Sequence, residues 1–383
     1  MRRLFQFAGA IVLTAAFLQT LRIGWADYLF HRDTADSIRQ AETVWPRDAR
    51  LEARLADLDP PNAVAHLRHA LSLDPGLSKS RIQLGLQLEL QGNVPEAEQS
   101  FLETARLDRQ FLPAWTLANF YARRNDPARF WPWARKAAEM SYDDIAPLLR
   151  LAFGFTSDPR VVLEQCVIRR PKVQREFLYY LVNQGMDASS IAARIMEKPT
   201  PDDARPLLAW LDRLIAAQRI ADARALWDAL SDHRLIPYPH AQGITNPDFA
   251  HAPLQCGFDW RIDPPDGITI SPGAGMLRID FSGRQPETSE IASQFLAADP
   301  GQYRLTFEYR TSGIPATTGL RWWIGDANSD PFPASADWRT LSWNVRSIAA
   351  SRLILLEQRE RGATRPEGIV YLRNLKLQSI GEN

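Results

Sequence analysis

The chain has 383 residues, of which 45% are hydrophobic, and its Lys plus Arg and Asp plus Glu both number 45. This length and apolar content exclude a disordered or fibrous chain and predict two or three folded units. A net charge of zero lacks the excess of cations that a nucleic-acid backbone attracts, so we expect no nucleic-acid partner. The two cysteines, Cys166 and Cys256, stand far apart and indicate neither a disulfide framework nor a zinc motif.

Residues 4–21 form an uncharged apolar run of about the length that a membrane-spanning helix needs. Arg2 and Arg3 precede the run and Arg22 follows it, a bias that places the N-terminus in the cytoplasm. We therefore predict a transmembrane anchor within residues 1–28, a single pass through the inner (cytoplasmic) membrane, and a periplasmic location for the bulk of the chain. A cleaved signal peptide is the alternative, because Gly24-Trp25-Ala26 offers small residues near a suitable cleavage position.

Residues 33–232 show helical apolar spacing and repeat themselves at the interval of stacked helix pairs. The clearest copy covers residues 77–110. Its pattern consists of Leu84-Gly85, Leu88, Gly92, Ala97, Phe101 and Ala105. The region resembles the tetratricopeptide repeat family, and the resemblance implies an α-solenoid of helix hairpins. Further hairpins with a faded motif are expected over residues 145–155, 160–168, 172–183, 188–197, 203–217 and 220–230.

A solenoid of this family implies a groove that binds a peptide or a protein partner. The candidate groove residues are polar side chains on the first helices of the two best repeats: Lys79, Gln83, Glu89, Asn119 and Arg123. A solvated helix face is the alternative interpretation of the same residues. His66 and His69 stand one helical turn apart, but no carboxylate or third histidine follows at ligand spacing, so we predict no metal site there.

Helical spacing ends in the Pro-rich linker at residues 233–244, and short alternating segments follow over residues 245–383. The alternation predicts strands near residues 267–271, 276–282, 291–296, 301–311, 319–325, 339–345, 352–357 and 368–377. Strands of this number and length predict an antiparallel β-sandwich of the jelly-roll type. The fold class is therefore a multidomain α + β chain.

Several spaced features of this second region resemble carbohydrate-binding modules with a jelly-roll fold. They are Asn246-Pro247-Asp248-Phe249, Gly257-Phe258-Asp259-Trp260, Pro300-Gly301 with Tyr303, Trp338, Gly368 and Asn374. The resemblance covers the whole of residues 245–383 and implies that the sandwich binds a glycan.

Alternation within two of the strands suggests where a glycan would lie. One strand places Glu308 and Arg310 on a polar face, and another places Arg321 and Trp323 opposite its apolar side chains. An exposed indole can stack on the C–H face of a sugar while charged groups hydrogen-bond its hydroxyls, so Trp323 is the leading candidate contact. The other tryptophans of the region are expected in the core or covering an edge: Trp260, Trp322, Trp338 and Trp343.

No nucleophile elbow, phosphate loop, metalloprotease motif or dinucleotide fingerprint occurs, so we expect no enzyme activity and no cofactor. A glycosidase remains a minor alternative if carboxylates among Glu308, Glu357 and Glu360 meet across strands. The combination of anchor, solenoid and sandwich resembles accessory proteins of bacterial exopolysaccharide or O-antigen assembly or export. The competing hypothesis is a pure protein-interaction scaffold whose sandwich binds no ligand.

Overall fold

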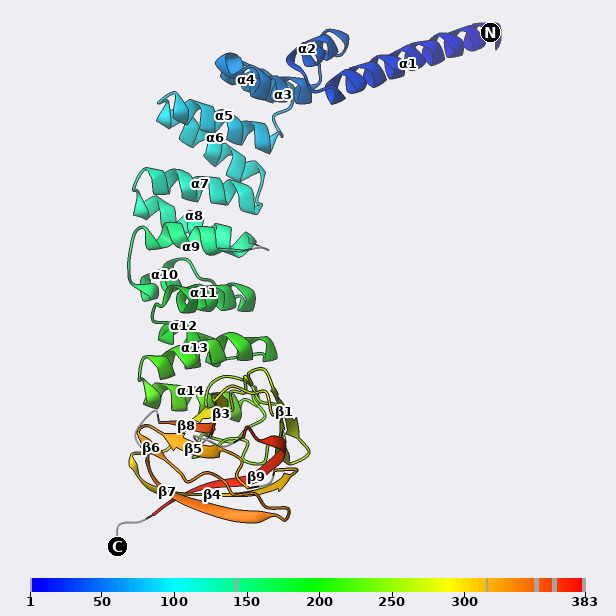
Figure 1. Ribbon diagram of the computed structural model, residues 1–383. Coiled ribbons are helices and arrows are strands. Elements are labelled where there is room, and N and C mark those ends of the chain that lie inside the picture. Colours follow the sequence, from blue (N-terminus) through cyan, green and yellow to red (C-terminus); the bar gives the residue numbers. More distant parts are fainter. Residues whose placement is uncertain (1, 142–143, 315, 348–350, 360–363, 381–383) are drawn as a thin grey trace. The chain divides into compact units, whose positions relative to one another are not determined.

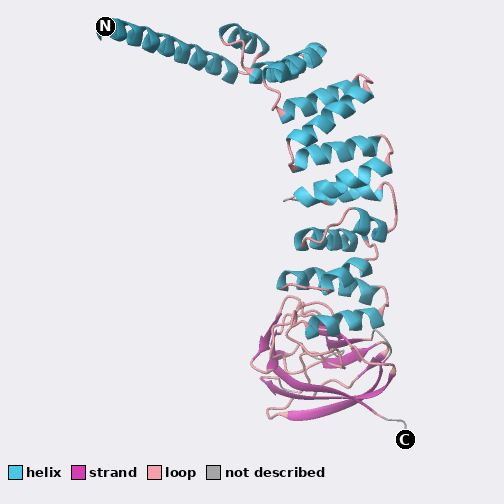
Figure 2. Ribbon diagram, turned by 180° about the vertical axis from the view of Figure 1, so that it is seen from behind, coloured by secondary structure: helices cyan, strands magenta, loops and turns pink. Residues whose placement is uncertain are grey.

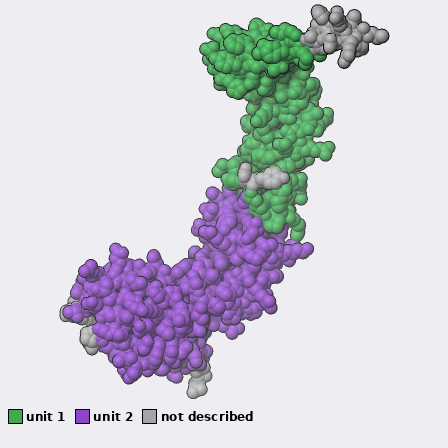
Figure 3. All heavy atoms as spheres, turned by 90° about the vertical axis from the view of Figure 1, so that its right-hand side faces the viewer, with its two compact units in different colours: residues 1–173 green, residues 174–383 purple. Residues whose placement is uncertain are grey.

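The structure is a computed structural model that describes residues 2–141, 144–314, 316–347, 351–359 and 364–380 (Figure 1). The chain divides into two compact units, Met1–Val173 and Gln174–Asn383, which Figure 3 shows in different colours. Figure 2 shows helices throughout the first unit, whereas the second unit contains both helices and strands.

The first unit consists of helix pairs that contact each other along the chain. Its elements are α1 (Arg2–His31), α2 (Ala35–Val44), α3 (Ala49–Leu58), η1 (Pro60–Asn62), α4 (Ala63–Leu73), α5 (Ser78–Leu90), α6 (Val94–Leu107), α7 (Phe111–Arg123), α8 (Pro127–Met140), α9 (Ala146–Phe153) and α10 (Pro159–Gln165). The pairs α3–α4, α5–α6 and α7–α8 pack as hairpins, and α4–α5 and α6–α7 contacts join successive pairs. This arrangement is a helical solenoid, as the sequence predicted.

The repeat pattern explains how two hairpins meet. Gly92 adopts a φ of 82° in the turn between α5 and α6, a conformation that favours glycine. Phe101 on α6 is buried, and its ring lies 5.3 Å from that of Phe120 on α7, edge to face. The aromatic position of one repeat therefore fills the space against the next repeat.

Among the described residues, no helix is both long enough and apolar enough to cross a membrane. The predicted single-pass anchor and the inner-membrane location that it implied are therefore wrong. Gln6, Gln19 and several small residues dilute the apolar run, and α1 continues through Arg22 as far as His31. The end of the helix instead packs on its neighbours, since Ala26 and Leu29 belong to a buried cluster formed with residues of α2 and α3.

The second unit begins with helices and continues into strands. The boundary between the units runs through α11 (Pro171–Gln184), and the later helices of the second unit are α12 (Ser189–Met196), η2 (Pro201–Asp203), α13 (Ala204–Ala216) and α14 (Ile220–Asp232). Its strands are β1 (Ile268–Gly273), β2 (Met276–Ser282), β3 (Thr288–Phe295), β4 (Gly301–Ser312), β5 (Leu320–Ile324), β6 (Ala327–Asn328), β7 (Arg339–Ser347), β8 (Arg352–Gln358) and β9 (Glu367–Ser379).

The strands form two antiparallel sheets. One has the order β1-β2-β9-β4-β7 and the other the order β3-β8-β5-β6. From β2 to β5, and again from β7 to β9, successive strands alternate between the two sheets. Buried and less buried residues alternate along β4 and β5. Phe307 of the first sheet and Trp322 of the second both point into the core between the sheets, and their ring centroids lie 5.7 Å apart.

The helices and the sandwich of this unit share a packed junction. Trp227 on α14 stacks on Tyr238 at 5.9 Å and meets Phe258 edge to face at 5.8 Å. Asp212 on α13 accepts hydrogen bonds at 2.7 Å from both the backbone N–H of Gly257 and the guanidinium of Arg261. Residues 233–244, predicted as a linker, thus lie inside one compact unit with the sandwich.

Candidate functional site

On the outer face of the five-stranded sheet, one arginine contacts two aromatic rings. Arg310 on β4 and Tyr371 on β9 are direct partners across the strand ladder. Trp338 precedes β7, and the β4–β7 register places it beside Arg310. The guanidinium carbon of Arg310 lies 4.5 Å from the ring centroid of Tyr371 and 5.3 Å from that of Trp338. Both rings therefore hold Arg310 through cation–π contacts.

The arginine retains a hydrogen-bonding group without a partner. Its Nε atom is buried and has no hydrogen-bond partner within the described part of the chain. A buried polar atom without a hydrogen-bond partner is costly in a folded protein.

A second charged pair flanks this arginine on the same face. Glu308 pairs with Arg373 across β4 and β9 at 2.9 Å, and the guanidinium of Arg373 covers the ring of Trp338 at 3.8 Å. A β-bulge at this point gives Asn374 a φ of 55°. Hydrogen bonds from Asn374 and Arg373 lower the pKa of Glu308 below its ordinary value, so its carboxylate is ionised at neutral pH.

A cavity of about 450 Å³ opens beside Arg310 and Tyr371. Its other walls are the end of β4 with the turn that follows it, and the segment 334–336 that precedes Trp338. The volume lies within the range of small-molecule sites, and backbone groups, hydroxyls and a guanidinium are available around it. Tyr371 is the aromatic residue of the cavity wall, and the guanidinium of Arg310 lies over its ring.

The structure does not bring the four predicted glycan residues together. Glu308 and Arg310 lie on the outer face of the five-stranded sheet, whereas Arg321 and Trp323 lie on β5 in the other sheet. The hydrophobic core separates the two outer faces. One saccharide therefore cannot contact all four side chains.

The structure places Trp323 between an apolar and a polar neighbour. It is half-buried, its direct partners across the two ladders are Ile354 and Asn328, and its indole N–H donates to the carbonyl of Gly325. The indole N–H is thus already used inside the protein. Trp338, expected in the core or over an edge, and Tyr371, which the sequence argument did not single out, form the aromatic pair instead.

The predicted groove residues lie on first helices, and two of them, Glu89 and Arg123, bond to each other. Gln83 on α5 donates to Asp57 on α3 at 3.0 Å. Arg123 on α7 donates to both carboxylate oxygens of Glu89 on α5, at 3.1 and 2.6 Å. Contacts between α3, α5 and α7 place these residues on a shared face of the solenoid. Asn119 donates to a carbonyl within its own helix, and Lys79 is exposed.

Leucine side chains add apolar surface to this face, and the sequence argument missed them. Leu86 and Leu90 lie on the same side of α5 as Gln83, and Leu90 is 80% exposed. Leu112 on α7 is also exposed, and it lies on the same side of that helix as Asn119. We call this the first-helix face. Helical spacing could have indicated it, because these leucines interrupt an otherwise polar stripe.

The carboxylates considered for glycoside hydrolysis lie apart. Glu308 is on the outer face of β4, whereas Glu357 on β8 is fully buried on the core side of the other sheet. Glu360 lies outside the described residues. The described pair thus does not flank a shared space, as the two acids of a glycosidase must.

No protein-family model and no curated protein matches the sequence. Among solved structures, the chain is similar to YrrB, described as a TPR protein with an unusual peptide-binding site, with 19% identity and a TM-score of 0.27, covering 53% of this chain and 96% of that one. It is also similar to BiXyn10A CBM1, with 16% identity and a TM-score of 0.27, covering 35% of this chain and 95% of that one. A mutant carbohydrate-binding module of family 29 has 16% identity and a TM-score of 0.23, covering 31% of this chain and 81% of that one.

Helix hairpins followed by an antiparallel sandwich confirm both resemblances that the sequence indicated. The chain is a solenoid of helix hairpins followed by an antiparallel β-sandwich, and the solved structures to which it is similar include a TPR protein and carbohydrate-binding modules.

Proposed function

We propose that this chain is a non-catalytic scaffold that holds a glycan on its sandwich and a partner protein on its helical repeats. The observation that carries the proposal is the arrangement of Trp338, Arg310 and Tyr371 beside the cavity on the five-stranded sheet. In this arrangement the cavity beside Tyr371 receives the sugar, and Arg310 and the Glu308–Arg373 pair hydrogen-bond its hydroxyls.

The protein partner is an extended peptide segment that lies along the first-helix face. The exposed leucines provide apolar anchors, and Lys79 together with the Glu89–Arg123 pair provides polar contacts. Joining the two binding surfaces in one chain suits an accessory protein of polysaccharide assembly or export, because such a protein must contact both a polymer and the proteins that process it.

A glycan-array screen of the full chain tests the first half of the proposal. Binding to a defined saccharide class that is lost in Trp338→Ala and in Tyr371→Ala is the expected result. If no saccharide binds and Trp338→Ala instead weakens capture of a protein, the alternative scaffold with a ligand-free sandwich replaces it. The mutual pairing of Glu308 and Arg373 is the observation that favours this alternative.

Peptide capture tests the second half. Leu90→Asp should weaken the capture of partner proteins at least tenfold without destabilising the fold, because the side chain is mostly exposed. Leu107→Asp is the matched control, since Leu107 is an exposed leucine on the second helix of the same hairpin. Equal effects of the two substitutions would contradict a binding site on the first-helix face.

A further inference from the structure

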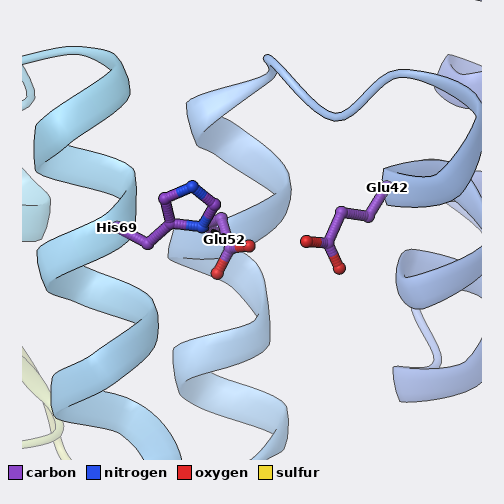
Figure 4. A group of neighbouring side chains, drawn as sticks. All are labelled: Glu42, Glu52 and His69. Atoms are coloured by element: carbon purple, nitrogen blue, oxygen red, sulfur yellow. Dashed lines mark hydrogen bonds and ion pairs between the residues drawn. The ribbon is translucent and has the colours of Figure 1, made fainter.

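Three helices of the first unit direct side chains with possible metal-ligand atoms toward a common point. Figure 4 shows Glu42 of α2, Glu52 of α3 and His69 of α4 converging. A carboxylate oxygen from each glutamate and a ring nitrogen of His69 all lie within 4.8 Å of one another. The fold therefore supplies the carboxylates that the sequence spacing around His66 and His69 did not reveal.

Glu52 is the central residue of this group. Its side chain is only 5% exposed, and each of its oxygens lies 2.8 Å from the Nδ1 atom of one histidine, His66 or His69. His66 in turn has its Nε2 atom 3.7 Å from Asp59. The two histidines are three residues apart on α4, so both rings reach the same carboxylate from one helix face.

The two glutamates bring a pair of carboxyl groups into one small space. Glu42 is half-buried and Glu52 is buried, so neither side chain can turn fully into solvent. A divalent cation between them would be attracted by both carboxylates, and this attraction is strong where water is largely excluded.

We propose that Glu42, Glu52 and His69 bind a divalent transition-metal cation of the zinc class. Metal ligands must be deprotonated, so any proton on the two carboxylates or on the ligating ring nitrogen leaves to solvent when the cation binds. A mixed set of one imidazole nitrogen and two carboxylate oxygens suits zinc, whereas calcium and magnesium prefer oxygen ligands alone.

The neighbouring residues support this assignment. His66 is placed to hydrogen-bond the second oxygen of Glu52 and so to fix the carboxylate's orientation, as residues behind metal ligands commonly do. Three protein ligands leave a fourth coordination position for water or for a group of a partner. Because the ligands come from α2, α3 and α4, the bound ion crosslinks these helices and stabilises the start of the solenoid.

The test uses the full chain, purified without a histidine tag and stripped with a chelator. Titration calorimetry with ZnCl₂ should show one site per chain, and thermal unfolding followed by circular dichroism should shift upward with Zn²⁺ but not with Mg²⁺. Binding of Co²⁺ should give the visible absorption of a four-coordinate ion.

Two variants locate the site. Glu42→Gln keeps the size of the side chain but removes a charged ligand oxygen, so Zn²⁺ should bind at least tenfold more weakly. His69→Gln should weaken binding to a similar extent, and His233→Gln, an exposed histidine outside the group, should leave it unchanged. Absence of saturable Zn²⁺ binding, or wild-type binding in both Glu42→Gln and His69→Gln, would overturn the proposal.

Discussion

Gly85 on α5 lies directly against the ring of Phe101 on α6, so close that a Cβ atom at Gly85 would stand 2.4 Å from Cε1 of that ring. No ordinary side chain fits at this separation, because real carbon contacts are near 3.5–4.0 Å. The close approach of the two helices in the clearest repeat therefore depends on a glycine at this position.

Replacing Gly85 by Ala should destabilise the first unit by about 1–3 kcal/mol, because overpacking outweighs the helix propensity that alanine adds. Urea unfolding followed by far-ultraviolet circular dichroism measures the change. Gly24→Ala in α1 is the matched control, since nothing lies within 4 Å of a Cβ there, and it should be neutral or stabilising. Adding Phe101→Leu should recover part of the loss in Gly85→Ala; no recovery would mean that the ring is not the obstacle.

The hydroxyl of Tyr238 donates to the buried carboxylate of Asp259 at 2.8 Å. Burial raises the pKa of Asp259, and its Oδ1 atom has no hydrogen-bond partner among the residues that the structure describes. Tyr238→Phe should therefore cost about 1–3 kcal/mol of stability in the second unit, because it removes a donor from a buried acceptor. Tyr303→Phe removes a hydroxyl whose hydrogen bond to the carbonyl of Asp299 is exposed, and it should change stability by less than about 0.5 kcal/mol. Equal losses in the two variants would contradict this account.

Glu357 gives the second unit a pH dependence. Burial raises its pKa from 4.5 to about 7, and its oxygens have no hydrogen-bond partner in the described ranges. Below pH 4.5 the carboxyl is neutral in both states. Between pH 4.5 and 7 only the unfolded chain has lost the proton, so stability falls as pH rises, by about 3 kcal/mol in total, and then levels off.

Glu357→Gln should remove this part of the pH dependence. The wild type and the variant should have similar stability near pH 4, while at pH 8 the variant should be the more stable of the two. Denaturant unfolding at a series of pH values measures the difference curve, which isolates Glu357 from every other titrating group. A flat difference curve would show that the carboxyl is not buried in solution.

The two outer faces of the sandwich can be distinguished with one pair of substitutions. Trp338→Ala should weaken binding of the glycan identified by array by about tenfold, because the indole holds both Arg310 and Arg373 through cation–π contacts worth about 0.5–1 kcal/mol each. Trp323→Ala should leave the affinity unchanged, because this ring lies on the other sheet. Isothermal titration of each full-length variant with the glycan measures the two affinities. Weaker binding in Trp323→Ala with unchanged binding in Trp338→Ala would instead make Trp323 the contact.

The local part of this structure could be predicted from the sequence, because it depends on neighbours along the chain. Alternation placed Glu308 and Arg310 on the polar face of their strand, and helical spacing located α13 and α14 to within two residues. The two-residue strand β6 was missed because it is too short to show alternation.

What could not be predicted depends on pairing between distant segments. Alternation fixes the face of a side chain within its own strand but not the sheet that the strand joins, so Arg310 and Trp323 were assigned to one site although the core separates them. Trp338 precedes its strand, and only the register of β4 with β7 places it beside Arg310. Glu42, Glu52 and His69 likewise belong to three helices, and no spacing along the chain links them.

The junction between α14 and the sandwich determines which piece of this chain could be moved into another protein. Cutting at Thr245 would separate Arg261 and Gly257 from Asp212 and would expose Trp227 to solvent where Phe258 had covered it. Gene fusion during evolution, or by design, would therefore transfer a sound domain only if it carried the preceding helix hairpin as well. In this chain, the part that could be transferred as a folded domain is the sandwich together with α13 and α14.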